Sequence, residues 1–326
     1  MNLIPSSPPQ IKPLSNEATR PLWSVMIPVY NCSQFLIKTL ESVLVQSISE
    51  KDMQIEVVDD ASTDTDVEAL VNSIGKGRIK YFRQPENVGS LRNFETCINR
   101  SRGHIVHILH GDDQVKNGYY ATLGNLFKQY PEAGAAFCRY TYVDEQGNKL
   151  YDEEPEMAQE GILKDWLLYI GERQRIQYVS IAVRREVYEK LGAFYGLTYG
   201  EDWEMWVRIA KYYPVAYTPN ILAEYRMHSD SISGTKFLTG QNTKDMVQVM
   251  EIIKDYLPPD QQEAIFKKSK KFYAYYGIWV ANELWHKLHD VRAVKAQIKQ
   301  ALHIHKDPIL YWQILKIYIK ILINKK

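Results

Sequence analysis

The amino-acid sequence predicts an α/β fold with a mixed, mostly parallel sheet, flanking helices and a helical extension at its C-terminal end. Two observations lead to this prediction. Short apolar strands and amphipathic helices alternate four times over the first 110 residues, which is typical of parallel strands joined by crossover helices. From about Thr243 onward, only helical periodicity remains.

The individual elements follow from local patterns. The apolar run from Trp23 to Pro28 stops at a proline and predicts the first strand. A helix follows over residues 33–46, where apolar residues recur at helical spacing and Ser33 can serve as the N-cap. The same patterns predict strands at 54–58, 78–83, 104–109, 135–143, 178–183 and 221–225, and helices at 66–73, 87–101, 119–130, 185–191 and 201–212.

Three regions are expected along the chain. Residues 1–21 contain no apolar core and four prolines before residue 20, so we expect a flexible lead-in that is not a signal peptide. Residues 22–240 carry the α/β pattern and are predicted to form one domain. Residues 241–326 are predicted to form a helical C-terminal region.

The composition excludes several classes of protein. The chain has 326 residues and a formal net charge of +1. This charge is too small to create a positive electrostatic field that attracts nucleic acid, so no nucleic-acid partner is expected. Its three cysteines (Cys32, Cys97 and Cys138) are far apart and predict neither a disulfide framework nor a zinc site, which fits a cytoplasmic protein. No run of 18 apolar residues exists, so no spanning helix is expected.

Two pairs of carboxylates follow predicted strands. Asp59 and Asp60 come directly after one strand, and Asp112 and Asp113 come shortly after another. In an open α/β sheet, ligands bind beyond the carboxyl ends of the strands, so the pairs suggest one polar site. One pair can accept hydrogen bonds from a base and a ribose, and the other can hold a divalent metal. The alternatives are a capped turn at the first pair and a solvated turn at the second.

Smaller polar groups can complete such a site. Pro28, Tyr30 and Asn31 form the turn after the first strand, which offers backbone N–H groups and a ring for a base to rest on. Arg92, near the start of a predicted helix, can pair with phosphate. The alternative for each is an ordinary turn or helix cap.

The segment from Tyr199 to Trp203 is the best candidate for catalysis. Gly200 frees the turn, and Asp202 in the first helical turn can take a proton from an acceptor hydroxyl as a general base. The alternative is an acid that compensates the helix dipole. After the last strand, Arg226 can meet phosphate and His228 can ligate the metal, although a lone histidine is more often a surface or core residue.

Taken in order, the segments PVYN, VVDDASTD, NVGSLRN, GDD, GEDW and YRMHSDSIS resemble those of the family 2 inverting glycosyltransferases. The resemblance covers roughly residues 22–235 and implies a GT-A fold for the catalytic domain, residues 22–240. It further implies transfer of one sugar from a nucleotide-diphosphate sugar, expected to be a UDP-sugar, to a hydroxyl of a glycan or lipid-linked acceptor. The anomeric configuration would invert, and no covalent enzyme intermediate would form.

The resemblance also assigns roles to residues. It places Pro28, Tyr30, Asp59 and Asp60 at the nucleoside, with Asp60 at the uracil. It matches Asp112 and Asp113 to the position that binds Mn²⁺ or Mg²⁺, with Asp113 as the direct ligand. It matches Asp202 to the catalytic base, and His228 to a histidine that completes the metal site in some members.

Two features depart from the family pattern. Many members have an acid where His110 stands, so the coordination or the metal preference is expected to differ here. The Gln-x-x-Arg-Trp segment and the membrane helices of polymerising members are absent, which argues against synthesis of a long polymer. Histidines 104, 107 and 110 do not predict a three-histidine zinc site, because residues three apart on a strand face opposite sides.

The sequence lacks the motifs that two other enzyme classes would carry. A sugar-phosphate nucleotidyltransferase would carry a Gly-rich loop with Arg and Lys near its N-terminus, and a dehydrogenase would carry Gly-x-Gly-x-x-Gly after the first strand. A degenerate homologue that binds nucleotide or glycan without turnover stays open as the non-enzyme alternative.

The last segment, from Pro308 onward, predicts an amphipathic helix, and its apolar surface has two interpretations. It can pack on the catalytic domain or on a second subunit, which would make a homo-oligomer. It can also lie in the membrane interface on the inner face, with Trp312 and its lysines at headgroup depth, near a lipid-linked acceptor. Its polar stripe contains Gln313, Lys316, Lys320 and Asn324.

Overall fold

The computed structural model describes residues 3–15, 19–46, 48–228 and 232–323. The chain divides into two compact units: residues 1–166, 176–198 and 208–227 form the first, and residues 167–175, 199–207 and 228–326 form the second. This division differs from the boundary expected near residue 240. Two short segments from the middle of the chain group with the C-terminal helices, and no local sequence pattern shows such long-range packing.

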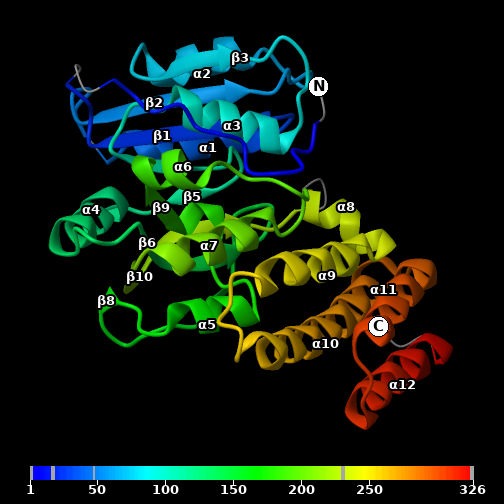
Figure 1. Ribbon diagram of the computed structural model, residues 1–326. Helices are drawn as coiled ribbons and strands as arrows, with labels where there is room; N and C mark the ends of the chain where they lie inside the picture. Colours follow the sequence, from blue (N-terminus) through cyan, green and yellow to red (C-terminus); the bar gives the residue numbers. More distant parts are fainter. Residues whose placement is uncertain (1–2, 16–18, 47, 229–231, 324–326) are drawn as a thin grey trace. The chain divides into compact units, whose positions relative to one another are not determined.

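A mixed sheet lies at the centre of the first unit (Figure 1). Its first half is parallel: β1 (Trp23–Val29) lies between β2 (Met53–Asp59) and β4 (Ile105–Ile108), and β3 (Lys80–Arg83) pairs with β2 at the edge. Every residue of β1, β2 and β4 is buried, as expected for parallel strands that are covered on both faces.

The second half of the sheet reverses direction at β9 (Ile181–Arg184), which pairs antiparallel with β4 and with β6 (Ala135–Val143). β10 (Val215–Arg226) then runs parallel to β6. The edges are completed by β5 (Gln114–Val115), β7 (Lys149–Asp152) and β8 (Gly161–Ile162). The mixed sheet with its parallel first half confirms the predicted fold class.

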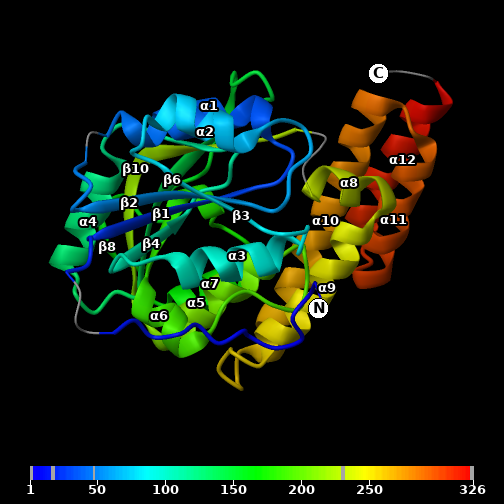
Figure 2. The same cartoon turned by 90° about the horizontal axis from the view of Figure 1, so that it is seen from above.

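Helices cover both faces of the parallel strands. α1 (Ser33–Leu44) and α2 (Val67–Gly75) lie on one face, whereas α3 (Ser90–Arg100) and α6 (Arg185–Leu191) lie on the other (Figure 2). α4 (Tyr119–Gln129) packs on β6 and β10. All five helices were predicted from apolar periodicity.

Two strands differ most from their expected bounds. Residues Tyr178–Ser180 form a short 3₁₀ helix, η1, so the strand expected from residue 178 begins at Ile181. β10 begins six residues earlier than expected, at Val215, and its pairing with β6 shifts register between Thr218 and Ile221. Pro219 lies at this shift, where an interrupted ladder tolerates a residue without an N–H group.

The segment that precedes β1 packs against the first unit in its described part. The carbonyl of Pro5 accepts a hydrogen bond from the N–H of Gly196 at 2.8 Å, and the carbonyl of Pro9 accepts one from Ala193 at 2.9 Å. Ile11 is buried. We expected a flexible lead-in from the prolines, yet prolines keep their carbonyl acceptors and can be held by neighbouring donors.

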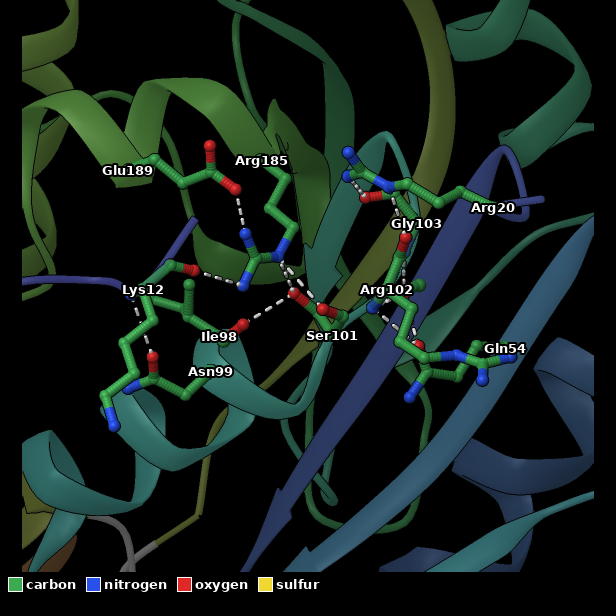
Figure 3. A network of polar contacts seen from close by, with 11 residues as sticks. Lys12, Arg20, Gln54, Ile98, Asn99, Ser101, Arg102, Gly103, Arg185 and Glu189 are labelled. Atoms are coloured by element: carbon green, nitrogen blue, oxygen red, sulfur yellow. Dashed lines mark hydrogen bonds and ion pairs between the residues drawn. The ribbon is translucent and has the colours of Figure 1, made fainter. Parts of the chain in front are cut away.

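Arg185 is the centre of a polar network that holds the segment before β1 against the first unit (Figure 3). Its guanidinium donates to the carbonyl of Lys12 at 3.1 Å and to the carbonyl of Ser101 at 2.9 Å, and it pairs with Glu189. Arg20 donates to the carbonyls of the two residues that follow Ser101, each at 2.8 Å. This network lies where β4 begins, so it stabilises the fold at the end of the sheet away from the acidic pairs.

The second unit is helical. Its C-terminal helices are α8 (Ile232–Thr239), α9 (Gln241–Lys254), α10 (Gln262–Leu288), α11 (Val291–Ile304) and α12 (Pro308–Leu322). Apolar side chains from the last three form a core that includes Trp285, Val294 and Ile314. None of the helices in the described ranges combines the length and the hydropathy needed to cross a bilayer.

Two shorter helices contribute to this unit: α5 (Trp166–Glu172), from residue 167 onward, and the first residues of α7 (Glu201–Tyr212). The indole N–H of Trp203 donates to the carbonyl of Ile170 at 2.6 Å, which links the two segments. The hydroxyl of Ser269 on α10 donates to the carbonyl of Glu172 at 2.8 Å. These bonds explain why the segments group with the C-terminal helices.

The final helix packs on its own unit through one face. Leu310, Ile314 and Ile317 are buried in the C-terminal core. Lys320, expected on an exposed polar stripe, instead donates to the side-chain oxygen of Asn282 on α10 at 2.7 Å. Asn324, the last residue of the predicted stripe, lies outside the described residues. The face that contains Leu310 therefore packs on α10 and α11 of its own unit, which neither interpretation of this helix had specified.

Candidate active site

The carboxyl ends of β1, β2 and β4 meet at one edge of the sheet. Val29, the last residue of β1, pairs with Asp59, the last residue of β2. The loops continue this alignment, because the N–H of Asp60 donates to the carbonyl of Val29 at 2.8 Å and the N–H of Gly111 donates to the carbonyl of Pro28 at 3.3 Å. The two predicted acidic pairs therefore follow strands on either side of β1.

Asp113 is the buried member of the second pair, with 1% of its surface exposed. Its Oδ1 accepts a hydrogen bond from the backbone N–H of Arg226 at 2.9 Å, whereas Oδ2 is buried without a partner among the described residues. Burial, and then the charge of Asp112, raise the pKa of Asp113 well above its usual range. A buried carboxylate with an unsatisfied oxygen is costly, and a divalent cation would offset that cost.

Arg226 supports the acidic turn from the end of β10. Its Nε donates to the carbonyl of Asp112 at 2.9 Å, and its Nη1 donates to the carbonyls of Asp144 and Glu145 at 3.1 and 3.0 Å. The guanidinium also lies 5.2 Å from the ring centre of Phe35, and the residue is 3% exposed. The expected contact of Arg226 with phosphate has no support in this arrangement, because these carbonyls already use Nε and Nη1.

His110 lies beside the acidic pair. One ligand atom from each of His110, Asp112 and Asp113 falls within 4.8 Å of the others, as a divalent cation would require. The imidazole is stacked on Phe94, with ring centres 5.2 Å apart, and lies against Tyr178, with ring centres 4.4 Å apart. Burial lowers the pKa of His110, although the nearby charge of Asp112 opposes this effect.

The first acidic pair is held by the protein itself. Asp59 is fully buried and accepts hydrogen bonds from the hydroxyl of Tyr81 at 2.7 Å and from Arg83 at 2.5 Å. Asp60 accepts hydrogen bonds from the backbone N–H groups of Val88 and Gly89, at 2.8 and 3.0 Å. Burial raises the pKa of Asp60 despite these two bonds. Both acids anchor loops at the sheet edge, and their predicted contacts with the nucleoside stay predictions.

The remaining candidates for donor binding differ in exposure. Pro28 is buried within β1, whereas Tyr30 is 52% exposed and presents its ring at the strand end. Asn31 adopts a left-handed backbone (φ 49°), and its side-chain oxygen accepts a hydrogen bond from the N–H of Thr63 at 2.8 Å. Arg92, on α3, forms a 2.6 Å ion pair within its own helix. Of this group, Tyr30 has the surface that a base could cover.

Asp202 belongs to the second unit and is the second residue of α7. The backbone N–H of Trp203 donates to its Oδ1 at 2.7 Å, and the side-chain amide of Gln174 donates to its Oδ2. Burial nevertheless raises the pKa of Asp202 to about 6, with both hydrogen bonds opposing the shift. A carboxylate with this pKa is mostly ionised at neutral pH and is a stronger base than an ordinary aspartate, as general-base catalysis requires.

The model of glycosyl transferase family 2 matches residues 24–192, more than half of the chain. The chain belongs to this family. An uncharacterized protein of Mycobacterium tuberculosis (strain CDC 1551 / Oshkosh) is 28% identical to it over 269 residues, which cover 76% of this chain and 80% of that protein. An uncharacterized glycosyltransferase of Rickettsia typhi is 24% identical over 217 residues, which cover 66% and 67%.

Solved structures resemble this family 2 glycosyltransferase in fold. TarS 1-349 of S. aureus, in complex with UDP-GlcNAc, matches with a TM-score of 0.65 and 14% identity over 92% of this chain and 90% of that chain. The mannosyltransferase PcManGT of Pyrobaculum calidifontis, in complex with GDP-Man and Mn²⁺, matches with a TM-score of 0.58 and 18% identity over 99% and 91%. The GT-A type of fold predicted from the sequence is therefore confirmed.

His110 joins the acidic pair in a group that could hold a metal ion, whereas the sequence had indicated it only as a departure from the family pattern. Its position directly before Gly-Asp-Asp, where many members have an acid, was the available signal. His228, predicted as the histidine ligand, is half-buried and belongs by its contacts to the second unit. Its role as a ligand stays a prediction, and Ser231 of the same motif lies outside the described residues.

Proposed function

We propose that this glycosyltransferase moves one sugar from a nucleoside-diphosphate sugar, best a UDP-sugar, to a hydroxyl of a glycan or lipid-linked acceptor, with inversion at the anomeric carbon. The observation that carries the proposal is the acidic turn after β4, where Asp113 keeps a buried oxygen without a partner among the described residues. Mn²⁺ or Mg²⁺ would fit there, held by Asp112 and Asp113, and would supply positive charge to the leaving diphosphate when bound.

Residues of the sheet edge are proposed to bind the donor. The exposed ring of Tyr30 offers a surface for the base, and the carboxylate of Asp60 lies at the end of the neighbouring strand. Two structural neighbours bind donors of this class: TarS is in complex with UDP-GlcNAc, and PcManGT is in complex with GDP-Man and Mn²⁺. These complexes support a nucleotide-sugar donor for this chain.

Asp202 is proposed to take the proton of the acceptor hydroxyl. Its pKa of about 6 supports this role, because the carboxylate is ionised at neutral pH and binds a proton more tightly than an exposed aspartate does. Gln174 and the N–H of Trp203 orient the carboxylate, one hydrogen bond to each oxygen. The deprotonated acceptor oxygen then attacks the anomeric carbon on the face opposite the leaving group, which inverts the configuration.

A lipid-linked acceptor is proposed from the exposed face of α12. Its large apolar side chains there include Ile309, Trp312, Leu315 and Ile319, and Lys316 lies over the ring of Trp312 at 5.3 Å. Basic and aromatic side chains of this kind suit the headgroup region of an anionic membrane. A second copy of the chain is the other candidate to cover this face, and the two are separated by the experiments on Trp312 given below.

The donor panel tests the function. The protein is incubated with UDP-, GDP- and dTDP-sugars plus Mn²⁺, and donor hydrolysis is followed by chromatography of the released nucleotide. We expect hydrolysis of one class of donor above the background of the Asp113→Asn variant. Donor binding without any turnover, for every donor and with acceptor mixtures added, would show that the chain is a degenerate binding protein.

A further inference from the structure

We propose that His110 is a metal ligand of this enzyme and gives its site a mixed nitrogen and oxygen donor set, which makes it prefer Mn²⁺ or Co²⁺ over Mg²⁺. This inference rests on the proposed function, since it concerns the metal at the same acidic turn. It adds a ligand that the family likeness did not assign, because many members have an acid at this position.

The inference rests on two buried atoms without hydrogen-bond partners in the group formed by His110, Asp112 and Asp113. Nε2 of His110 and Oδ2 of Asp113 are both buried, and neither has a hydrogen-bond partner among the described residues. Both residues belong to the group whose ligand atoms lie within 4.8 Å of one another. Each unsatisfied buried polar atom costs roughly 1–3 kcal/mol, and a cation shared by the imidazole and the carboxylates would satisfy both atoms at once.

The histidine three residues earlier, within β4, has both ring nitrogens satisfied. The ring nitrogens of His107 have partners, the hydroxyl of Tyr120 at 3.2 Å and the carbonyl of Val179 at 3.2 Å. His107 is thus a satisfied core residue. His110 differs because its ring is fixed between Phe94 and Tyr178 while Nε2 stays unsatisfied.

The chemistry of the ligands determines the metal preference. Mg²⁺ takes oxygen ligands and dehydrates reluctantly, so an imidazole in place of a carboxylate weakens its site. Transition metals accept imidazole nitrogen, and affinity for such sites rises from Mn²⁺ to Co²⁺. An imidazole also adds no negative charge, which reduces the attraction for a hard cation further.

Pulsed electron paramagnetic resonance of Mn²⁺ bound with UDP tests the ligand directly, because a coordinated ¹⁴N nucleus modulates the electron spin echo. We expect this modulation in the His104→Gln variant and in the His228→Asn variant, which removes the other predicted histidine ligand. We expect its loss when His110→Asp or His110→Asn is added to His228→Asn, each protein being checked for folding by thermal unfolding. His104 is the matched control, since it precedes the same strand and is exposed.

Calorimetry with each metal gives the second readout. We expect His110→Asp to lower the preference for Mn²⁺ over Mg²⁺ in UDP binding by about tenfold or more, and His104→Gln to leave it unchanged. If Mn²⁺ supports donor binding and turnover but the His228→Asn protein shows no ¹⁴N modulation, or keeps it when His110→Asp is added, this inference falls while the proposed function stands. If neither metal binds with UDP, the metal part of the proposed function falls as well.

Discussion

The backbone N–H of Arg226 donates a hydrogen bond to Oδ1 of Asp113, which connects the end of β10 to the acidic turn after β4. The side chain of the same arginine holds the carbonyls of Asp112, Asp144 and Glu145. One residue therefore fixes the turn by its backbone and the surrounding loops by its guanidinium, which makes Arg226 a positioning residue for the proposed metal site.

Replacing Arg226 tests this relationship. Arg226→Gln removes the buried guanidinium but keeps the backbone N–H, so we expect a loss of stability on the order of 3 kcal/mol and weaker Mn²⁺-dependent binding of UDP. Chemical denaturation and calorimetry measure the two effects. Arg139→Gln is the control, because Arg139 on β6, the strand beside β10, also donates to a backbone carbonyl, that of Glu153. Unchanged metal binding in a folded Arg226→Gln protein would contradict the positioning role.

Asp202→Asn is expected to abolish transfer while donor affinity stays nearly intact. The amide cannot accept the proton of the acceptor, and loss of a general base lowers the rate by about 10²–10⁴-fold. Product formation under saturating donor measures the rate, and calorimetry with UDP measures affinity. The matched control is Glu204→Gln on the same helix, whose carboxylate accepts a hydrogen bond from Tyr256. Near-normal turnover by Asp202→Asn would show that another group is the base.

The pH dependence of transfer follows from the raised pKa of Asp202. The base must be deprotonated, so kcat/KM should rise with pH and level off above about pH 6. Gln174→Leu removes a donor that stabilises the carboxylate, and the acid limb should then move to higher pH. Measuring kcat/KM against pH for the wild-type protein and for Gln174→Leu, with the same donor, checks this prediction. An acid limb that does not move in Gln174→Leu would indicate that a different group titrates.

The two faces of α12 are expected to respond differently to substitution. Leu310→Ala empties a buried position in the C-terminal core and should cost about 2–5 kcal/mol. Trp312→Ser removes a ring that is 55% exposed, and should leave stability nearly unchanged while reducing sedimentation with anionic liposomes. If the wild-type chain never binds liposomes and Trp312→Ser changes its oligomeric state, a second copy covers this face instead.

Local sequence patterns were enough to predict the parallel half of the sheet. Each strand and each helix there has its own short-range signal, such as the apolar run from Trp23 to Pro28. They also located both acidic pairs, since each pair lies at or shortly after the end of a strand. The grouping of Asp202 with the C-terminal helices depends on contacts such as the hydrogen bond from Tyr256 to Glu204, which have no local signature.

The same limit applies to side-chain roles within the site. Arg226 was expected at phosphate because of its charge, but its guanidinium binds backbone carbonyls that lie about 80 to 114 residues away in the sequence. Strand periodicity argued against a three-histidine zinc site, and His110 was expected only to alter the metal coordination; its place in one group with the two acids follows from the fold. Which polar atoms stay unsatisfied depends on the complete fold.

Calorimetric titration with UDP, with and without Mn²⁺, is the most direct test of the central claim that the acidic turn binds the donor with a metal. The account predicts clearly tighter UDP binding with Mn²⁺ for the wild-type protein. For Asp113→Ala it predicts the same UDP affinity with and without Mn²⁺. For Asp152→Asn, a control acid on β7, it predicts that Mn²⁺ still tightens UDP binding. Equal affinity for UDP with and without Mn²⁺ in the wild-type protein would contradict the account.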